Sequence, residues 1–302
     1  MSNSRVSKGT PIVAGFFEKR TSSIQYIVAD PKSKKCAIID PVFDFDPNSG
    51  ATATHSADEL LQYIEQENYE LAWILDTHPH ADHFSAAGYL KDKTGVPTAI
   101  GEKVIEVQKL WKGLYNYSNA FPTDGSQWDK LFRDGERFYI GDMEVEVLLT
   151  PGHTLASIAY VVGDAAFIHD TIFMPDGGTA RADFPGGSAH VLWNSIQRIM
   201  ALPDQTRLFT GHDYCPAGRK EPLWESTVAQ QRADNIHLTE ARTEGEFVAL
   251  REKRDRELPM PKLILQSLQV NIRGGRLPEA EEDGKRYLKI PLNALEEAPW
   301  DA

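Results

Sequence analysis

The sequence predicts an α/β fold, with a layered core followed by a helical C-terminal extension. Short apolar runs bounded by turn residues, which are typical of strands, dominate the first two thirds of the chain and alternate with single helical patterns. The last quarter has mostly helical patterns. Because 302 residues suffice for one extended domain, we expect a single domain over 1–302, with its core over about 10–225 and the extension over about 226–302.

The first half of the core shows a hairpin, a helix and a buried strand. Apolar stretches at 25–29 and 36–40 flank a polar turn and predict a β-hairpin. A Ser-x-x-Glu capping box at 56–59 precedes an apolar helical stripe. The compact apolar run 71–75 predicts a buried strand that ends at a group of histidines, and residues 84–91 have a helical pattern.

The second half of the core continues with strands that end at further polar residues. Apolar and acidic residues alternate over 143–149, which indicates a half-buried strand. The runs 157–162 and 165–168 flank a Gly-Asp turn and predict another hairpin. The remaining predicted elements are a helix with Leu192, Ile196 and Ile199 on one face, a last strand at 206–210, and helices at about 225–235, 244–257 and 262–270.

Composition excludes several classes of partner. The formal net charge is -12, which argues against nucleic acid or an anionic membrane as the main partner. No apolar run is long enough to span a membrane, and residues 1–10 lack the apolar core of a signal peptide. Two cysteines are too few for a disulfide framework and suit a reducing compartment. We therefore expect a cytoplasmic protein, with Cys36 in the core and Cys215 an inert bystander.

The residues at 77–83 read Thr-His-Pro-His-Ala-Asp-His, and further candidate ligands lie at the ends of other predicted strands. A strand end followed by a tight loop lets several side chains converge on one metal, and neighbouring loops complete the ligand set. Ordinary structural histidines and capping aspartates are the alternative, but an HxHxDH run has few reasons to exist other than ligation. The candidates are His78, His80, Asp82, His83, His153, Asp170 and His212.

These motifs together resemble a known family. HxHxDH at 78–83, Thr-Pro-Gly-His-Thr at 150–154, the strand-end Asp170 and Gly-His-Asp-Tyr at 211–214 follow in the order and spacing of the metallo-β-lactamase superfamily over roughly 10–225. The resemblance implies the metallo-β-lactamase fold, a four-layered αββα sandwich with the metal at one edge.

One branch of that superfamily matches additional residues. Ala-Arg-Ala-Asp-Phe-Pro-Gly-Gly at 180–187 looks like the Gly-Arg-Thr-Asp-Phe segment of persulfide dioxygenases, also called sulfur dioxygenases. Residues 211–237 are also similar to that branch, and the chain looks like a bacterial form. The implied reaction is the oxidation of glutathione persulfide by O₂ to sulfite and glutathione, and the resemblance suggests a possible homodimer.

The same resemblance implies one Fe(II) per chain, held by His78, His153 and Asp170. Zinc or manganese stay open, because imidazole and carboxylate ligands accept them as well. The other members of the set would orient ligands and water by hydrogen bonds during catalysis. These catalytic residues are His80, Asp82, His83 and His212.

A binuclear zinc thioester hydrolase of the glyoxalase II type is the alternative, because the full ligand set for two metals is present. In that case one metal is held by three histidines, the other by one aspartate and two histidines, and Asp170 lies between them. The two sets are His78, His80 and His153, and Asp82, His83 and His212.

Three residues are candidates for binding substrate. Arg181 suits a carboxylate because its guanidinium bonds such groups bidentately, although an internal pair with Asp183 is equally open. Tyr214 lies close to His212 in sequence, with a packed loop tyrosine as the alternative. Arg219 is a candidate for an anionic substrate, with a solvated loop as the alternative.

The other histidines are predicted to be structural. His169 precedes Asp170 on a predicted strand, and adjacent strand residues point to opposite faces, so His169 should face away from the metal. His55, His190 and His237 have no partner pattern.

Overall fold

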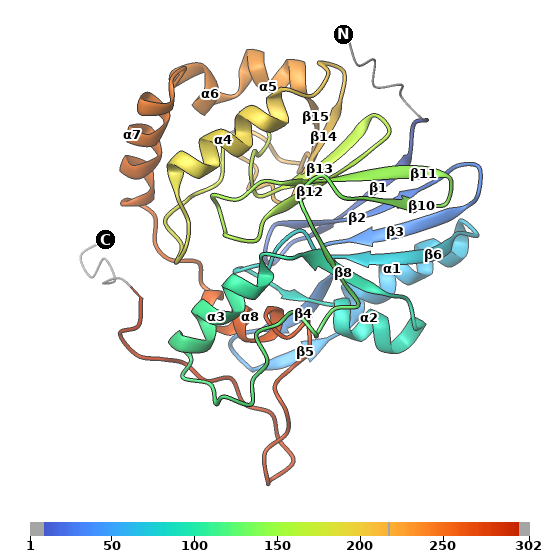
Figure 1. Cartoon of the computed structure of the whole chain (residues 1–302), viewed down its shortest axis with the longest axis vertical. Helices are drawn as coiled ribbons and strands as arrows, with labels where there is room; N and C mark the ends of the chain where they lie inside the picture. Colours follow the sequence, from blue (N-terminus) through green and yellow to red (C-terminus); the bar gives the residue numbers. More distant parts are fainter. Residues whose placement is uncertain (1–8, 217, 296–302) are drawn as a thin grey trace.

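The structure, a computed structural model, describes residues 9–216 and 218–295. Two six-stranded sheets face each other and carry helices on their outer faces (Figure 1). The first sheet has the order β1-β2-β3-β6-β8-β9, in which β3, β6, β8 and β9 run parallel. Its strands are β1 (Ile12–Glu18), β2 (Ser23–Ala29), β3 (Lys35–Ile39), β6 (Glu70–Leu75), β8 (Thr98–Gly101) and β9 (Lys130–Phe132).

The second sheet follows the chain order from β10 to β15, and only its β13–β14 pair is parallel. A small third sheet, ordered β5-β4-β7, lies near the helices below the first sheet in Figure 1. The strands of these two sheets are β10 (Arg137–Ile140), β11 (Met143–Leu149), β12 (Ile158–Val162), β13 (Ala165–His169), β14 (Arg207–Thr210) and β15 (Glu225–Thr227), then β4 (Val42–Asp46), β5 (Ala51–Ala53) and β7 (Phe84–Ser85).

Helices cover the outer face of each sheet. Apolar residues of α1 and α2 pack on the first sheet, and those of α4, α5 and α7 pack on the second. The two sheets share a third apolar core between them, so the predicted four-layered αββα sandwich is confirmed. The helices are α1 (His55–Gln66), α2 (Ala87–Thr94), α3 (Val104–Leu114), α4 (Ala189–Met200), α5 (Val228–Asp234), α6 (Ile236–Glu240), α7 (Glu244–Asp255) and α8 (Ile264–Asn271).

The core between the sheets lies directly against the edge at which the strands that carry the candidate ligands end. The rings of Phe167 and Phe209 stack at 5.1 Å, and Tyr26 meets both edge-on. The Tyr26 hydroxyl donates to the carbonyl of Thr210 at 2.5 Å, just before His212. A rigid aromatic packing therefore fixes the strand ends that carry the candidate ligands.

No helix among the described residues has both the length and the apolarity that a membrane crossing requires.

The capping box predicted at residues 56–59 is wrong. The helix α1 begins at His55, and its N-cap is Thr54, which makes no side-chain capping bond. Ser56 instead donates its hydroxyl proton to Asp44 in β4 at 2.7 Å. The tertiary partner satisfies this hydroxyl, so the local pattern does not form.

Three element boundaries also differ from the predictions. Residues 84–91 begin as the short strand β7, which pairs with β4, and the helix α2 follows only from Ala87. The strand at 206–210 is not the last, because β15 pairs with β14 and Thr227 then caps α5 through a capping box with Gln230. The extension is helical only to Asn271, and residues 272–295 contain no helix. The ends of the chain, 1–8 and 296–302, lie outside the described residues.

His237 illustrates a structural histidine with a measurable pH effect. Its Nδ1 accepts the backbone N–H of Thr179 at 2.9 Å, and burial together with the charge of Arg251 lowers its pKa to about 3. The unfolded chain takes up this proton near pH 6.5, whereas the folded chain does not, so stability falls as the pH falls below about 6.5. We expect a loss of about 2 kcal/mol between pH 6.5 and 5 from this group. Urea unfolding at both pH values should show a smaller loss for His237→Asn than for wild type, and an unchanged loss for His190→Asn; equal losses in all three would contradict the assignment.

Candidate metal centre

The loop at 77–83 is held by a carboxylate at the end of the neighbouring strand. Asp40 follows β3, which runs parallel to β6, so both strand ends reach the same edge. Its two carboxylate oxygens accept the backbone N–H of Thr77 at 2.7 Å and the Thr77 hydroxyl at 2.8 Å. Asp40 thus fixes the start of the loop. The sequence analysis did not single out this residue.

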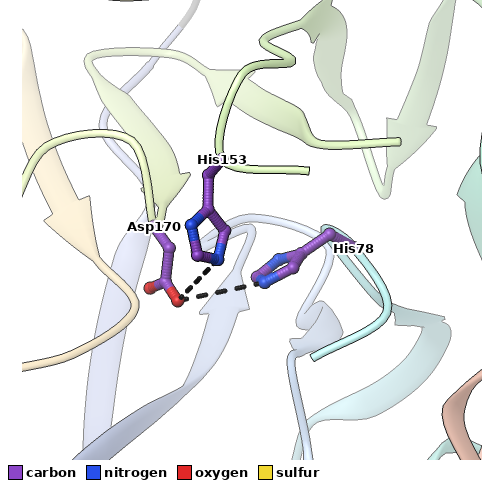
Figure 2. A group of neighbouring side chains, drawn as sticks. All are labelled: His78, His153 and Asp170. Atoms are coloured by element: carbon purple, nitrogen blue, oxygen red, sulfur yellow. Dashed lines mark ion pairs between the residues drawn. The ribbon is translucent and has the colours of Figure 1, made fainter. Parts of the chain in front are cut away.

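Three side chains from distant parts of the chain converge at this edge. His78 follows β6, His153 follows β11, and Asp170 follows β13 (Figure 2). Oδ2 of Asp170 lies 3.9 Å from Nε2 of His78 and 3.7 Å from Nε2 of His153. The three donor atoms lie within 4.8 Å of one another, and all three residues are buried. We call these residues the triad.

The protonation states of the triad suit metal binding. Burial lowers the pKa of His78 well below its usual range and also lowers that of His153, so both imidazoles are neutral. Nδ1 of His153 donates to the carbonyl of Arg181 at 2.9 Å, which leaves Nε2 as the lone-pair nitrogen. Burial raises the pKa of Asp170, but the charge of His212 and its hydrogen bond outweigh burial and bring the pKa to about 2.

The triad fits a metal ion by the chemistry of its donors. Nε2 of His78 is buried and has no hydrogen-bond partner among the described residues. An unpartnered buried imidazole nitrogen is costly unless it binds something, and a metal ion satisfies it. Two neutral imidazoles and one carboxylate are the donor set that non-haem Fe(II) uses with open positions, and zinc accepts them as well.

A second set of donors lies beside the triad and is hydrogen-bonded internally. Oδ2 of Asp82 lies 2.7 Å from Nε2 of His212 and 3.0 Å from Nδ1 of His83. The other nitrogen of His212 lies 2.6 Å from Oδ1 of Asp170. Burial lowers the pKa of His212, but Asp170 and Asp82 outweigh it and raise the pKa well above its usual range. His212 therefore bridges two carboxylates.

His80 turns away from the triad toward Asp40. Its Nε2 lies 3.0 Å from Oδ1 of Asp40. Burial lowers the pKa of His80, but the charge of Asp40 outweighs it and raises the pKa. His80 is grouped in space with Asp40 and Asp76, and with Asp82 and His83, but not with His78.

Besides Asp40, two further residues that were not predicted from the sequence complete the site. Ser23, at the start of β2, places its hydroxyl 3.1 Å from Asp82, His83 and His212 alike. Asn271, the last residue of α8, donates from Nδ2 to the backbone carbonyls of His80 at 2.7 Å and His83 at 2.8 Å. Neither position carries a sequence signal, because a serine in a strand and an asparagine in a helix are ordinary.

The candidate substrate-binding residues differ in whether their side chains are already bound to other groups of the protein. Arg181 makes a bidentate pair with Asp183, with both distances 2.6 Å, and donates to the carbonyl of Pro259, which is the internal pairing that the sequence left open. Arg219 binds both Asp213 and Asp176. Both guanidiniums therefore hold loops together.

Tyr214 is the candidate whose side chain is most available. It is 61% exposed, and its ring lies parallel to the ring of His212 at 5.6 Å and edge-on to Phe173.

The two cysteines lie in different surroundings. Cys36 is buried in β3, as predicted, whereas Cys215 follows Tyr214 with a positive φ of 45°.

The prediction that His169 faces away from the site is wrong. Its ring packs against the ring of His78 at 4.9 Å, and its Nε2 lies 3.2 Å from the Thr171 hydroxyl. The pairing of β13 with β14 shifts register between Phe167 and His169, and His169 has a φ of 38°. This irregularity breaks the strand alternation on which the prediction relied.

Gly211 provides a test of how closely Asp170 is held. A Cβ at this position would meet Oδ1 of Asp170 at 2.5 Å. We expect Gly211→Ala to push the carboxylate out of place and to weaken metal binding by about 10- to 100-fold, as changes around ligands do. Chelator competition measures this affinity. Gly113→Ala, where a Cβ meets nothing within 4 Å, is the control, and equal affinities in the two variants would contradict the expectation.

Comparison with known proteins agrees with this geometry. The family model for the metallo-beta-lactamase superfamily matches residues 22–212. The beta-lactamase hydrolase-like protein of Xylella fastidiosa (strain 9a5c) is 64% identical over 291 residues, which are 96% of this chain and 67% of that protein. Glyoxylase B2 of Dictyostelium discoideum is 48% identical over 284 residues, 93% of this chain and 97% of that protein. The crystal structure of ETHE1 from Myxococcus xanthus superposes with a TM-score of 0.69 at 28% identity and covers 88% of this chain and 100% of that chain. With the fold and the family model in agreement, this chain belongs to the metallo-beta-lactamase superfamily.

Proposed function

We propose that this protein is an Fe(II)-dependent persulfide dioxygenase that oxidises glutathione persulfide with O₂ to sulfite and glutathione. The observation that carries the proposal is the separation of the seven candidate ligands into two groups. The triad brings together two neutral imidazoles and one carboxylate. Of the remaining four residues, Asp82, His83 and His212 are hydrogen-bonded to one another or to Ser23, and His80 forms an ion pair with Asp40. The similarity to the mitochondrial persulfide dioxygenase ETHE1 of Bos taurus, 28% identical over 271 residues, and to the ETHE1 structure from Myxococcus xanthus supports the same function.

In this proposal the triad holds the iron, which when bound supplies electrons to O₂, a chemistry that zinc lacks. His78 and His153 contribute neutral nitrogens, and the hydrogen bond from His153 to the carbonyl of Arg181 keeps that ring oriented. His212 bonds Oδ1 of Asp170 and so fixes the carboxylate that offers Oδ2 to the site. No side chain has to act as a nucleophile.

The other candidate residues of the site have roles in the same proposal. Asp82 and His83 position His212, and His80 tied to Asp40 holds the loop at 77–83 in shape. Tyr214 is proposed to contact the substrate, because its exposed ring lies over His212. Arg181 and Arg219 act on substrate binding mainly by fixing the loops around the site, since their guanidiniums already bind carboxylates.

Metal analysis combined with O₂ uptake tests the proposal. The chain is purified without air, its iron and zinc are counted, and O₂ consumption is recorded after glutathione persulfide is added. We expect one iron per chain and O₂ uptake with release of sulfite. A chain that holds zinc in pairs and consumes no O₂ under these conditions would refute the proposal.

A second candidate function is a binuclear zinc thioester hydrolase. It is favoured by the presence of all seven ligand residues and by the 48% identity to a protein named as a glyoxylase. Release of thiol from S-lactoylglutathione by the zinc-loaded chain, and not by the iron-loaded chain, would favour this function over the dioxygenase.

A further inference from the structure

We propose that Asn271, the last residue of α8, is a positioning residue for the metal centre, because its amide holds the loop that carries His78. This inference rests on the part of the proposed function in which the triad holds the metal. Asn271 belongs to the C-terminal extension and lies outside residues 22–212, which the family model matches. The extension is therefore a part of the metal site as well as a cover for the core.

All the hydrogen-bonding groups of the Asn271 amide face the backbone of this loop and of the strand that follows it. Nδ2 donates to the carbonyl of His80 at 2.7 Å and to the carbonyl of His83 at 2.8 Å. Oδ1 accepts the backbone N–H of Ser85 at 2.7 Å. A side-chain amide offers two N–H donors and one oxygen, so both of its ends are matched to these partners. Asn271 is buried, where backbone groups need such partners.

Contacts on two sides fix the position of Asn271 itself. Gln108 of α3 donates from Nε2 to the carbonyl of Ile272, the next residue, at 2.9 Å. After the helix, Gly275 has a φ of 74°, and a Cβ at this position would meet the carbonyl oxygen of Ser85 at 2.6 Å. The chain after α8 thus packs directly on the backbone of β7. Asn271 is held by the fold, and its amide imposes that position on the loop.

The hydrogen bonds of Asn271 reach the triad through packed imidazole rings. The ring of His83 contacts the ring of His80, which in turn contacts the ring of His78, with 4.1 Å between the centroids in both pairs. Asp40 fixes the start of the same loop. His78 therefore lies between two points at which the loop is held, and loss of the second one should let its ring move.

Variants of two residues of α8 separate positioning from packing. Asn271→Leu keeps the branched shape of the side chain and removes all three hydrogen bonds. Asn271→Ser is a milder change that keeps a hydrogen-bonding group, and it takes the place of Asn271→Leu if that variant does not fold. Leu268→Ala is the matched control, because Leu268 is 3% exposed and packs in the apolar core that α8 shares with α3. Its loss destabilises α8 and removes no side-chain bond to the loop.

Zinc affinity and stability are measured on the same samples. Each metal-free variant is checked for folding by circular dichroism, titrated with Zn²⁺ against a chromophoric chelator, and unfolded in urea. We expect Asn271→Leu to bind zinc about tenfold more weakly than wild type, since changes around metal ligands cost about 10- to 100-fold. Asn271→Ser should fall between the two. Leu268→Ala should unfold at a lower urea concentration and still bind zinc as tightly as wild type.

A purely structural role of Asn271 predicts a different result, in which stability falls and the zinc affinity of the folded chain does not change. The inference is overturned if Asn271→Leu, or Asn271→Ser where only that variant folds, binds zinc as tightly as wild type. It is also overturned if Leu268→Ala loses as much zinc affinity, because the packing of α8 would then be the cause.

O₂ uptake separates the inference from the proposed function. Weaker zinc binding in the Asn271 variants, with no O₂ uptake by the iron-loaded wild type, supports the positioning role and refutes the dioxygenase. Unchanged zinc binding in these variants, with O₂ uptake by the wild type intact, refutes the positioning role and leaves the dioxygenase standing.

Discussion

His78→Ala is expected to abolish tight metal binding at the triad and, under the proposed dioxygenase function, O₂ uptake as well. Changes of residues around a metal ligand typically cost 10- to 100-fold in affinity, so loss of a ligand should cost at least about 100-fold. At a metal concentration about 100 times the wild-type dissociation constant, bound metal stabilises the fold by about 2.7 kcal/mol. A 100-fold weaker site would keep only about 0.4 kcal/mol of this. Iron content after anaerobic reconstitution, and unfolding with and without metal, measure both effects.

The control for this variant is His190→Ala. The side chain of His190 is 64% exposed and pairs with Glu244, away from the triad. It should keep its iron and its metal-dependent stabilisation. The assignment of the triad would be wrong if His78→Ala retained iron and O₂ uptake at the level of His190→Ala.

The convergence of the candidate ligands could be predicted from the sequence because they follow strands whose ends share one edge. His78 comes after β6, which was visible as a compact apolar run, and His153 comes after β11, which was visible as an alternation of apolar and acidic residues. The HxHxDH spacing then limited the chemistry to metal binding. The order of the four layers was predicted from the resemblance to the metallo-β-lactamase superfamily, and the packing of helices on both outer faces of the sheets confirms it.

The residues that the sequence did not reveal act through tertiary contacts. Ser23 is placed by its β-bridge to His212, and Asp40 reaches the loop at 77–83 because β3, which it follows, pairs with β6. Ser56 was misjudged as a cap because Asp44, distant in sequence, accepts its proton. His169 was misjudged because a register shift in β13 cannot be seen in a pattern of alternating residues.

Arg251→Leu is expected to destabilise the protein by about 3–5 kcal/mol, although Arg251 lies in the extension and far from the motifs in sequence. Arg251 is 2% exposed and donates from Nε to Asp255 at 2.9 Å and from a terminal nitrogen to the carbonyl of Thr179 at 2.9 Å. Removing it leaves the buried carboxylate of Asp255 without its positive partner. An unpaired buried charge costs more than the pair contributes, which is why the loss should be large. Urea unfolding at pH 7 measures it.

Arg251→Leu should also affect metal binding, through the short backbone segment at residues 181–182. Oδ2 of Asp255 accepts the N–H of Ala182 at 3.0 Å, and the carbonyl of the preceding residue, Arg181, accepts from His153. We therefore expect Arg251→Leu to weaken metal binding by about tenfold as well.

Adding Asp255→Asn to Arg251→Leu separates the charge from the packing. The amide is neutral, so the double variant should recover part of the lost stability, while a variant with Lys253→Leu on the exposed face of α7 should resemble wild type. If the double variant were less stable than Arg251→Leu, the unpaired charge would not be the cause of the loss. In that case Arg251 and Asp255 would affect the triad through the packing of α7 against the segment at 179–182, and not through their charges.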